Sequence, residues 1–301
     1  MMKKDLKIAE NVKIWFGISL VLMTISLGSL LIQGLNFGID FVGGTIVNIE
    51  LHTTFENADA RAIIDKYDPS ADVTYAGDEQ TQVVITSKEN FSTEDRQAIF
   101  SAFQEKYNLE TTDLLSIDTV NPSIGAEATN NAILAVIVAV GLMLLYITFR
   151  FEFVSGITAI MALIHDVIVV VGVYSLFQIQ VNSPFIAAIL TVLGYSIMDT
   201  VVVFDRVREN RPKFGKYAYG ELLDASVTQT MRRSINTSIS TFLAIAALYF
   251  FGVPAIQDFA LPLMVGVVIG TYSSIFNAGA LWYVISVQLH KRKMKPTTKK
   301  A

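Results

Sequence analysis

Long apolar segments dominate the pattern of this chain. Six of them, at 14–32, 132–149, 154–177, 185–204, 235–252 and 259–287, are each long enough to cross a bilayer as a helix. About 20 helical residues cover the ~30 Å hydrocarbon core. The first segment is too long for a cleaved signal peptide and has no small-residue cleavage site after it, so we expect it to be retained. The pattern predicts an α-helical polytopic membrane protein with six transmembrane helices.

The segment 36–127, between the first two apolar runs, has short stretches with strand-like or helix-like spacing of apolar residues, which is typical of a small folded domain. Alternation predicts strands at 45–51, 72–77, 81–87 and 114–120, and helical spacing predicts helices at 57–67 and 92–107. Ser92 begins the sequence Ser-Thr-Glu-Asp, which predicts an N-terminal cap for the second helix. Gly77-Asp78 predicts a turn between the middle strands. The order βαββαβ is typical of a ferredoxin-like α+β domain.

The four predicted regions follow from these boundaries. They are a cytoplasmic N-terminus with the first helix (1–35), an extracytoplasmic α+β domain (36–127), helices two to six with a cytoplasmic loop at 205–233 (128–289), and a basic cytoplasmic tail (290–301). The two large basic clusters set this orientation, because Lys and Arg favour the cytoplasmic side. Residues 205–233 hold seven of them and 290–301 hold six. The acidity of 36–127 does not argue against an extracytoplasmic position, since large translocated domains need not follow this preference of basic residues for the cytoplasmic side.

Composition excludes several kinds of chemistry. The chain has no cysteine, which rules out disulfides and thiolate–metal sites, and its three histidines are scattered. We find no nucleotide-binding loop and no catalytic cluster, so the sequence predicts neither an enzyme nor a bound cofactor or metal. We also expect contact with membrane lipid and none with nucleic acid.

Asp199 is the most informative residue, because it lies inside the otherwise apolar run 185–204. A carboxylate at that depth costs roughly 2.5–3.5 kcal/mol on insertion-derived scales and marks a functional site by default. Ser196 lies on the same polar stripe. On the next predicted helix, Arg233 can turn inward toward Asp199 or extend to the cytoplasmic surface. We favour the inward orientation, since Arg232 can take the surface position.

Other polar and small residues within the spans allow either a functional or a purely structural interpretation. His165 and Asp166 are adjacent in the third span and point ~100° apart, so they cannot both face one partner. Either one faces a neighbouring helix while the other makes a local hydrogen bond, or the two take part in a proton relay, since histidine titrates near neutral pH. Thr237 and Ser240 continue a stripe from Arg233, and Gly266 and Gly270 form a GxxxG pair. Helix packing is the favoured explanation for those stripes.

Asp40, Gly43 and Gly44 follow the first span, where the Gly-Gly pair predicts a tight turn. Here a structural role is favoured: we expect Asp40 to cap or hydrogen-bond the junction between the membrane and the outer domain.

Five motifs in order resemble a known family. They are GIDFVGGT at 38–45, ALIHD at 162–166, GYSIMDTVVVFDRVREN at 194–210, TQTMRRS at 228–234 and FALPLMVG at 259–266. Together they cover most of the chain and are similar to the SecF family of the bacterial protein-export accessory complex SecD–SecF. The third motif, around Asp199, is the most specific.

The resemblance implies properties that composition cannot supply. The family is distantly related to the proton-driven resistance–nodulation–division exporters. Its members pair with SecD, which supplies six further helices, and assist the SecYEG channel. They use the proton gradient rather than ATP to promote export of a translocating preprotein across the plasma membrane. In the family, the positions matching Asp199 and Arg233 are implicated in proton conduction, with a further Asp from SecD.

Two alternatives stay open at this point. One is a scaffold that is not energised and organises SecD, SecYEG and the YidC insertase; it would not need an intramembrane Asp/Arg pair. The other is a half-size proton-coupled exporter of small molecules, against which the single small outer domain argues. Sodium could replace protons as the coupling ion, because a carboxylate with hydroxyl neighbours suits either.

Overall fold

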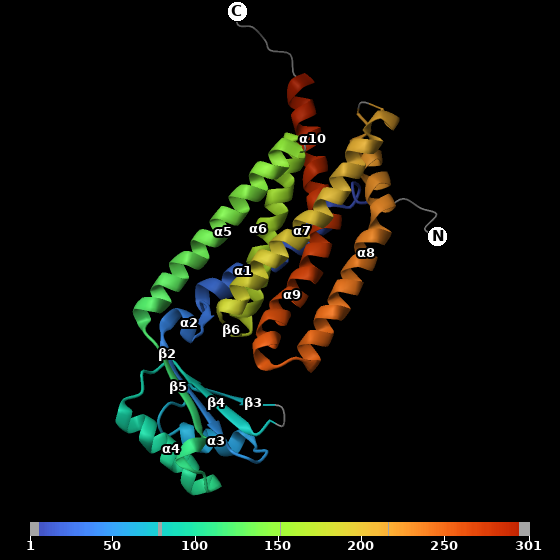
Figure 1. The fold of residues 1–301 in the computed structure, drawn as a ribbon. Coiled ribbons are helices and arrows are strands. Elements are labelled where there is room, and N and C mark those ends of the chain that lie inside the picture. The colour runs from blue at the N-terminus through green and yellow to red at the C-terminus, as the bar shows by residue number, and fades with distance from the viewer. Residues whose placement is uncertain (1–5, 78–79, 151, 216, 295–301) are drawn as a thin grey trace, which may run out of the picture.

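A computed structural model describes residues 6–77, 80–150, 152–215 and 217–294 of the chain. A long helical bundle stands above a smaller unit of strands and helices (Figure 1). Six helical stretches of the described residues are long and apolar enough to cross a membrane. The predicted basic tail lies outside the described residues from position 295 onward, as do Asp78 of the predicted turn and residues 1–5.

The helical stretches of the bundle extend beyond most of the apolar runs that predicted them, although α6 has the same length as its run. They are α1 (Val12–Ile32), α5 (Pro122–Arg150), α6 (Phe153–Leu176), α7 (Ser183–Asn210), α8 (Tyr219–Phe251), α9 (Pro254–Tyr272) and α10 (Ala278–Met294). A five-residue π-helix, η3 (Ser273–Asn277), joins α9 to α10, and a 3₁₀ turn, η2 (Arg211–Lys213), follows α7. The polar first turns of α5 and α8 continue the helices beyond their apolar cores, which is why hydrophobicity alone placed their starts too late.

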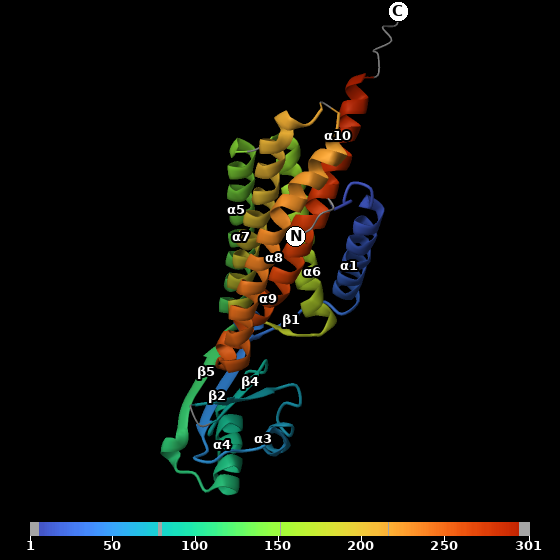
Figure 2. The ribbon, with the colours of Figure 1, turned by 90° about the vertical axis from the view of Figure 1, so that its right-hand side faces the viewer.

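Helix α7 occupies the middle of the bundle. It packs against α6, α8, α9 and η3, while α1 packs mainly against α6. Helix α5 lies along one side with most of its surface exposed, and α1 lies along another (Figure 2). Clusters of buried apolar side chains surround α7 at both ends, for example Val203 and Phe204 with Leu223, and Phe185 and Ile189 with Tyr174. The central position of α7 brings its polar residues into contact with several neighbours at once.

The smaller unit is a four-stranded antiparallel sheet with two helices. Its elements are β2 (Gly44–Glu50), α3 (Asn57–Ile64), β3 (Asp72–Ala76), β4 (Gln82–Ser87), α4 (Thr93–Tyr107), a 3₁₀ turn η1 (Thr111–Asp113) and β5 (Leu114–Val120). The strands lie side by side in the order β3-β4-β2-β5. Alternate residues such as Val47 and Ile49 face α4, where Ile99 and Phe103 complete the core. The side chain of Ser92 accepts the Asp95 amide and caps α4, as its sequence predicts.

Three short elements join the two parts, and sequence periodicity did not reveal them. They are β1 (Asn36–Phe37), α2 (Ile39–Val42) and β6 (Gln180–Val181). Strand β1 pairs in parallel with β6, which directly precedes α7. Two-residue strands and a single helical turn are too short to produce a periodic signal. The pairing places the segment after α1 beside the start of α7.

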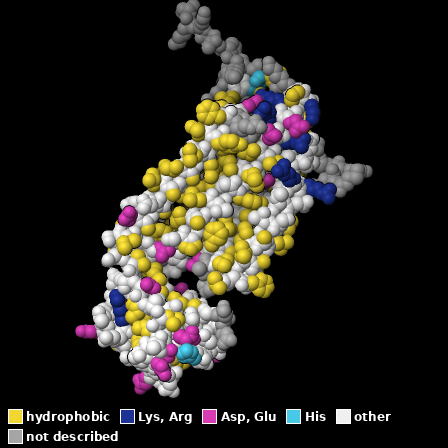
Figure 3. Space-filling view, viewed as in Figure 1, with side chains coloured by type: hydrophobic (Ala, Val, Ile, Leu, Met, Phe, Trp, Pro, Cys, Tyr) yellow, Lys and Arg dark blue, Asp and Glu magenta, His cyan; other side chains and the backbone are white. Residues whose placement is uncertain are grey.

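The surface divides into zones. Apolar side chains cover the middle of the helical part, basic side chains gather at its far end, and acidic side chains are frequent on the α/β unit (Figure 3). An apolar belt between polar ends is the surface expected of a helical membrane protein. The structure and the sequence therefore agree on a polytopic membrane protein.

Candidate functional site

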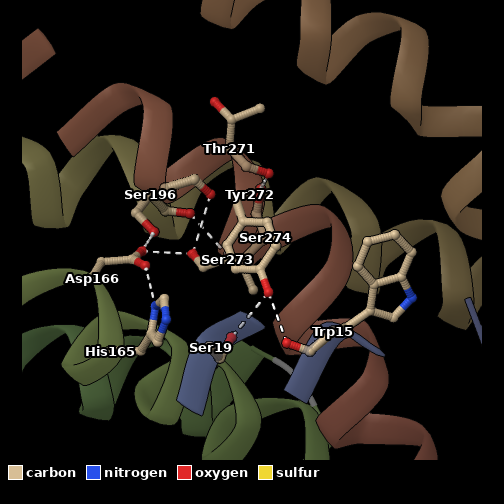
Figure 4. Close-up of polar contacts among 11 residues, drawn as sticks. Trp15, Ser19, His165, Asp166, Ser196, Thr271, Tyr272, Ser273 and Ser274 are labelled. Carbon is tan, nitrogen blue, oxygen red and sulfur yellow. Dashed lines mark hydrogen bonds and ion pairs between the residues drawn. The ribbon is translucent and has the colours of Figure 1, made fainter. Parts of the chain in front are cut away.

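Asp166 is completely buried in the bundle. Its Oδ2 atom accepts two hydroxyl hydrogen bonds, from Ser196 of α7 at 2.5 Å and from Ser273 of η3 at 2.7 Å. The carboxylate on α6 is thus held by two neighbouring segments (Figure 4). Hydrogen bonds to charged groups are short and roughly twice as strong as neutral ones, so these contacts stabilise a carboxylate that the apolar surroundings disfavour.

Asp199 has the same arrangement on α7. It is 8% exposed, and its two oxygens each accept one serine hydroxyl. Ser234 of α8 donates at 2.6 Å, and Ser274 of η3 donates at 2.5 Å. The two aspartates therefore form a repeated motif, in which each carboxylate of one helix is bound by two serines from other segments.

The π-helix connects the two carboxylates. Ser273 and Ser274 are consecutive, yet one binds Asp166 of α6 and the other binds Asp199 of α7. Short π-helical segments occur frequently at functional sites, because the extra residue in a turn redirects side chains. The result is a polar layer across α6, η3, α7 and α8 in the middle of an apolar bundle.

His165 extends this layer on one side. Its Nδ1 atom lies 3.1 Å from Oδ1 of Asp166, while the buried Nε2 atom has no hydrogen-bond partner among the described residues. The side chains of His165 and Asp166 thus contact each other, while Asp166 also contacts Ser196 and Ser273. Nearby, the Tyr272 hydroxyl donates to the Trp15 carbonyl at 2.8 Å and lies 3.1 Å from the Ser19 hydroxyl, which fastens α1 to the end of α9 (Figure 4).

The inward orientation of Arg233 is wrong in this structure. Arg233 is exposed on α8, and no ion pair joins it to Asp199 in the part of the chain described. It lines a surface pocket together with Tyr146, Asp205 and Arg206. The next residue, Ser234, occupies the position beside Asp199 instead.

The predicted stripe on α8 was therefore one residue out of phase. Thr237 and Ser240 are exposed, and the hydroxyl of Thr237 bonds to the backbone carbonyls of Arg233 and Ser234. The buried stripe of α8 carries Ser234 and Ser238. These two serines are four residues apart, so they lie on the same face of the helix.

Glycines allow α9 to approach α7 closely. A side chain at Gly266 would overlap Val192, and one at Gly270 would press on Ser196. Both contacts fit the helix-packing explanation favoured from sequence. The close approach brings η3, and with it Ser273 and Ser274, into reach of the aspartates.

The junction residues have clear structural roles. Asp40 Oδ2 accepts the backbone N–H of Ser183 at the start of α7, at 2.7 Å. Gly43 and Gly44 have φ angles of 86° and 150°, which favour glycine. Added side chains there would overlap the backbone of Val120 and Ser87 respectively.

A separate titratable pair lies on the α/β unit. Nε2 of His52 is 2.9 Å from Oδ1 of Asp113. The hydrogen bond from Asp113 raises the pKa of His52, and the same contact lowers the pKa of Asp113. Both side chains belong to the α/β unit and not to the bundle that holds the buried aspartates, since His52 follows the end of β2 and Asp113 lies in η1. No group of three or more metal-ligating side chains occurs within the described residues.

The fold and the polar layer define a class: a polytopic helical membrane protein with an α/β unit inserted after its first span and paired buried carboxylates in its bundle. Comparison with known families narrows this. The family described as "Protein export membrane protein SecD/SecF, C-terminal" matches residues 100–288, and the "SecD/SecF GG Motif" matches residues 28–54. The chain belongs to the SecD/SecF family of protein export membrane proteins. The first match contains both aspartates and the second contains Asp40, Gly43 and Gly44.

Curated relatives and solved structures agree with this family. The chain is 38% identical over 290 residues to the protein translocase subunit SecF of Sebaldella termitidis, covering 93% of this chain and 92% of that protein. It is 36% identical to SecF of Haemophilus influenzae, covering 94% and 86%. The crystal structure of SecDF from Thermus thermophilus matches with a TM-score of 0.80 and 34% identity, over 95% of this chain. The chain spans 39% of the length of that SecDF chain.

Proposed function

We propose that this chain is the SecF-type subunit of an accessory complex of the Sec translocase, and that it couples the proton gradient to protein export through Asp199. One observation carries the proposal: a carboxylate in the central helix of an apolar bundle is held by serine hydroxyls from two other segments. An ionisable residue at this depth is costly and is functional by default. Family membership supplies the setting in protein export.

The geometry suggests how protonation would act. An ionised Asp199 accepts strong hydrogen bonds from Ser234 of α8 and Ser274 of η3. Protonation removes the charge that makes these bonds strong, so the contacts between α7, α8 and η3 weaken together. Once these contacts are weakened, α8 is free to rotate about its axis. Successive residues on a helix point ~100° apart, so a rotation of α8 by that angle would bring Arg233 to the position that Ser234 now occupies beside Asp199.

His165 and Asp166 extend the proposed proton path. Asp166 shares the π-helical serine pair with Asp199, because Ser273 and Ser274 are adjacent. Imidazole exchanges protons near neutral pH, and His165 lies directly beside Asp166. We infer that a proton passes through this polar layer and that the work is conformational rather than catalytic. No bound cofactor enters this proposal; the proton gradient supplies the energy.

We propose SecD as the partner that covers the exposed face of α8. Arg233, Asn236, Thr237 and Ser240 are exposed on this one helix, within the span of the bundle. Polar side chains facing hydrocarbon are unfavourable, and another protein surface would relieve that cost. The solved SecDF structure carries the matching region within a chain about two and a half times as long. SecYEG, the translocating preprotein and the YidC insertase complete the proposed set of partners.

The proposed orientation places both termini and the loop 205–233 in the cytoplasm, and the α/β unit outside the plasma membrane. The concentration of basic side chains at the far end of α7 and α8 supports this (Figure 3). We assign the α/β unit to the ferredoxin-like arrangement, because its element order and antiparallel sheet have that pattern.

Export into vesicles tests the proposal. Asp199→Asn keeps the size and hydrogen bonding of the side chain but cannot ionise. We expect it to assemble with SecD and to abolish gradient-dependent stimulation of late-stage export, and Arg233→Met to do the same. Asp205→Asn, an exposed residue on the same helix, is the matched control and should keep the stimulation. Separate proton and sodium gradients identify the ion. Full stimulation with Asp199→Asn would instead support a scaffold.

A further inference from the structure

The first turn of helix α7 is capped by a side chain that is distant in the sequence. The N-cap residue Asn182 makes no capping hydrogen bond with its side chain. Its amide instead donates to Oδ2 of Asp258 at 3.0 Å. The N–H of Ser183 is accepted by Asp40 of α2, which lies 143 positions earlier in the chain. A carboxylate at this end also interacts favourably with the positive end of the helix dipole.

The position of Asp40 is set by the strands beside it. Strand β1 pairs with β6 directly before α7, and the Gly38 N–H donates to the Val181 carbonyl at 2.9 Å. A side chain at Gly38 would overlap the side chain of Asn182 and press on the Val181 carbonyl, which shows how close the two segments lie. The backbone pairing therefore brings α2 to the first turn of α7, and the Asp40 carboxylate makes the contact with the helix itself.

Helix α2 is fastened in turn to the α/β unit. A side chain at Gly43 would overlap the Val120 carbonyl and the Pro122 nitrogen, and one at Gly125 would overlap the Phe41 carbonyl. These close contacts hold α2 against the end of β5 and the first turn of α5. Gly44 is also paired with Val120 across β2 and β5. Because packed backbone leaves no room for sliding, α2 and the α/β unit behave as one body.

Helix α7 connects Ser183, which Asp40 contacts, to the polar layer. It is continuous from Ser183 to Asn210 and carries Ser196 and Asp199. At 1.5 Å per residue, Asp199 lies about 24 Å along the helix from Ser183. A helix of this length moves as a stiff rod, so a shift at Asp199 reaches its capped end.

We propose that Asp40 is a positioning residue that couples α7 to the α/β unit, so that the unit follows the movement of the helix that carries Asp199. This inference rests on the proposed function of Asp199 for the origin of the movement. It assigns to the Asp40 side chain a role in transmission, in addition to its role in the local structure. Without the carboxylate, α7 and the unit remain connected by backbone but no longer move together.

The distance between two spin labels, measured by pulsed electron paramagnetic resonance, tests the coupling. Because the chain has no cysteine, labels can be placed through Ser101→Cys on α4 and Phe251→Cys at the end of α8, both at exposed positions. The full chain is studied with its SecD partner in lipid vesicles. Four backgrounds are compared, each with and without Asp199→Asn: the parent, Asp40→Ala, Asp40→Asn and Ser92→Ala. The last removes the cap of α4 and is the matched control.

We expect Asp40→Ala to broaden the distance distribution and to remove its dependence on Asp199→Asn. Asp40→Asn keeps an acceptor oxygen and should restore the parent width, and Ser92→Ala should leave it unchanged. An unchanged width in Asp40→Ala would overturn the coupling role, and so would a full shift on Asp199→Asn in that background. The comparison of widths between the parent and Asp40→Ala does not require Asp199 to be the coupling residue, so it tests the role of Asp40 separately. The proposed function fails on its own if Asp199→Asn retains gradient-dependent export.

Discussion

The close contact between α7 and α9 makes a quantitative prediction about stability. Gly266→Ala places a methyl group where the side chain of Val192 lies, and Val192 is buried. Overpacking of this kind costs about 1–3 kcal/mol. Val192→Ala alone removes two methyl groups from the same contact, at ~0.8 kcal/mol for each carbon plus a cavity term. In the double variant the new methyl occupies the vacated space, so we expect a favourable coupling energy of about 0.5–3 kcal/mol.

The free energy of unfolding of the single and double variants, measured in mixed micelles, gives this coupling. Gly194→Ala is the matched control: it also adds a methyl to a helical glycine, but no atom lies within 4 Å of the new position. It should be neutral or stabilising by up to about 1 kcal/mol, because alanine favours helix. If Gly266→Ala is as stable as Gly194→Ala, or if the two changes at 192 and 266 add without coupling, the described α7–α9 contact is incorrect.

Two further predictions concern orientation and pH. Cysteines at Ser101 and Arg208, which are exposed, should react with an impermeant thiol reagent from opposite sides of the membrane; labelling from the same side would contradict the six-span orientation. The raised pKa of His52 means that its pairing with Asp113 stabilises the α/β unit fully below its ordinary value of 6.5, and less as pH rises through the raised pKa. Hydrogen exchange near η1, corrected for intrinsic rates, should therefore quicken with rising pH in the parent but not in His52→Gln; equal pH dependence in both would refute this.

The sequence predicted the parts of the fold that depend on long periodic patterns. All six spans coincide with long apolar runs, since crossing a bilayer requires about 20 apolar residues. The strands at 45–51 and 114–120 agree with β2 and β5 to within one residue at each end. The elements β1, α2 and β6 are defined by contacts between distant segments, so no local pattern could reveal them.

The polar layer was only partly predictable. Asp199 and Asp166 stood out because a carboxylate in an apolar helix is rare. Of their four serine partners, Ser196 lies on the predicted polar stripe, but its contact with Asp166 depends on how α6 and α7 pack and could not be predicted from the sequence. Attraction between opposite charges favoured Arg233, but packing turned α8 so that Ser234 meets Asp199. The π-helix that directs Ser273 and Ser274 to different carboxylates has no sequence signature that we could read.

The protonation state of Asp199 tests the central claim most directly. Infrared difference spectra of the complex in vesicles, recorded on acidification of the outer side, report carboxyl groups that gain a proton. The account predicts a protonated-carboxyl band that is absent in Asp199→Asn and present in Asp205→Asn, the exposed control on the same helix. If the bands of Asp199→Asn and the parent are the same, Asp199 does not take up the proton, and the proposed coupling through this residue is wrong.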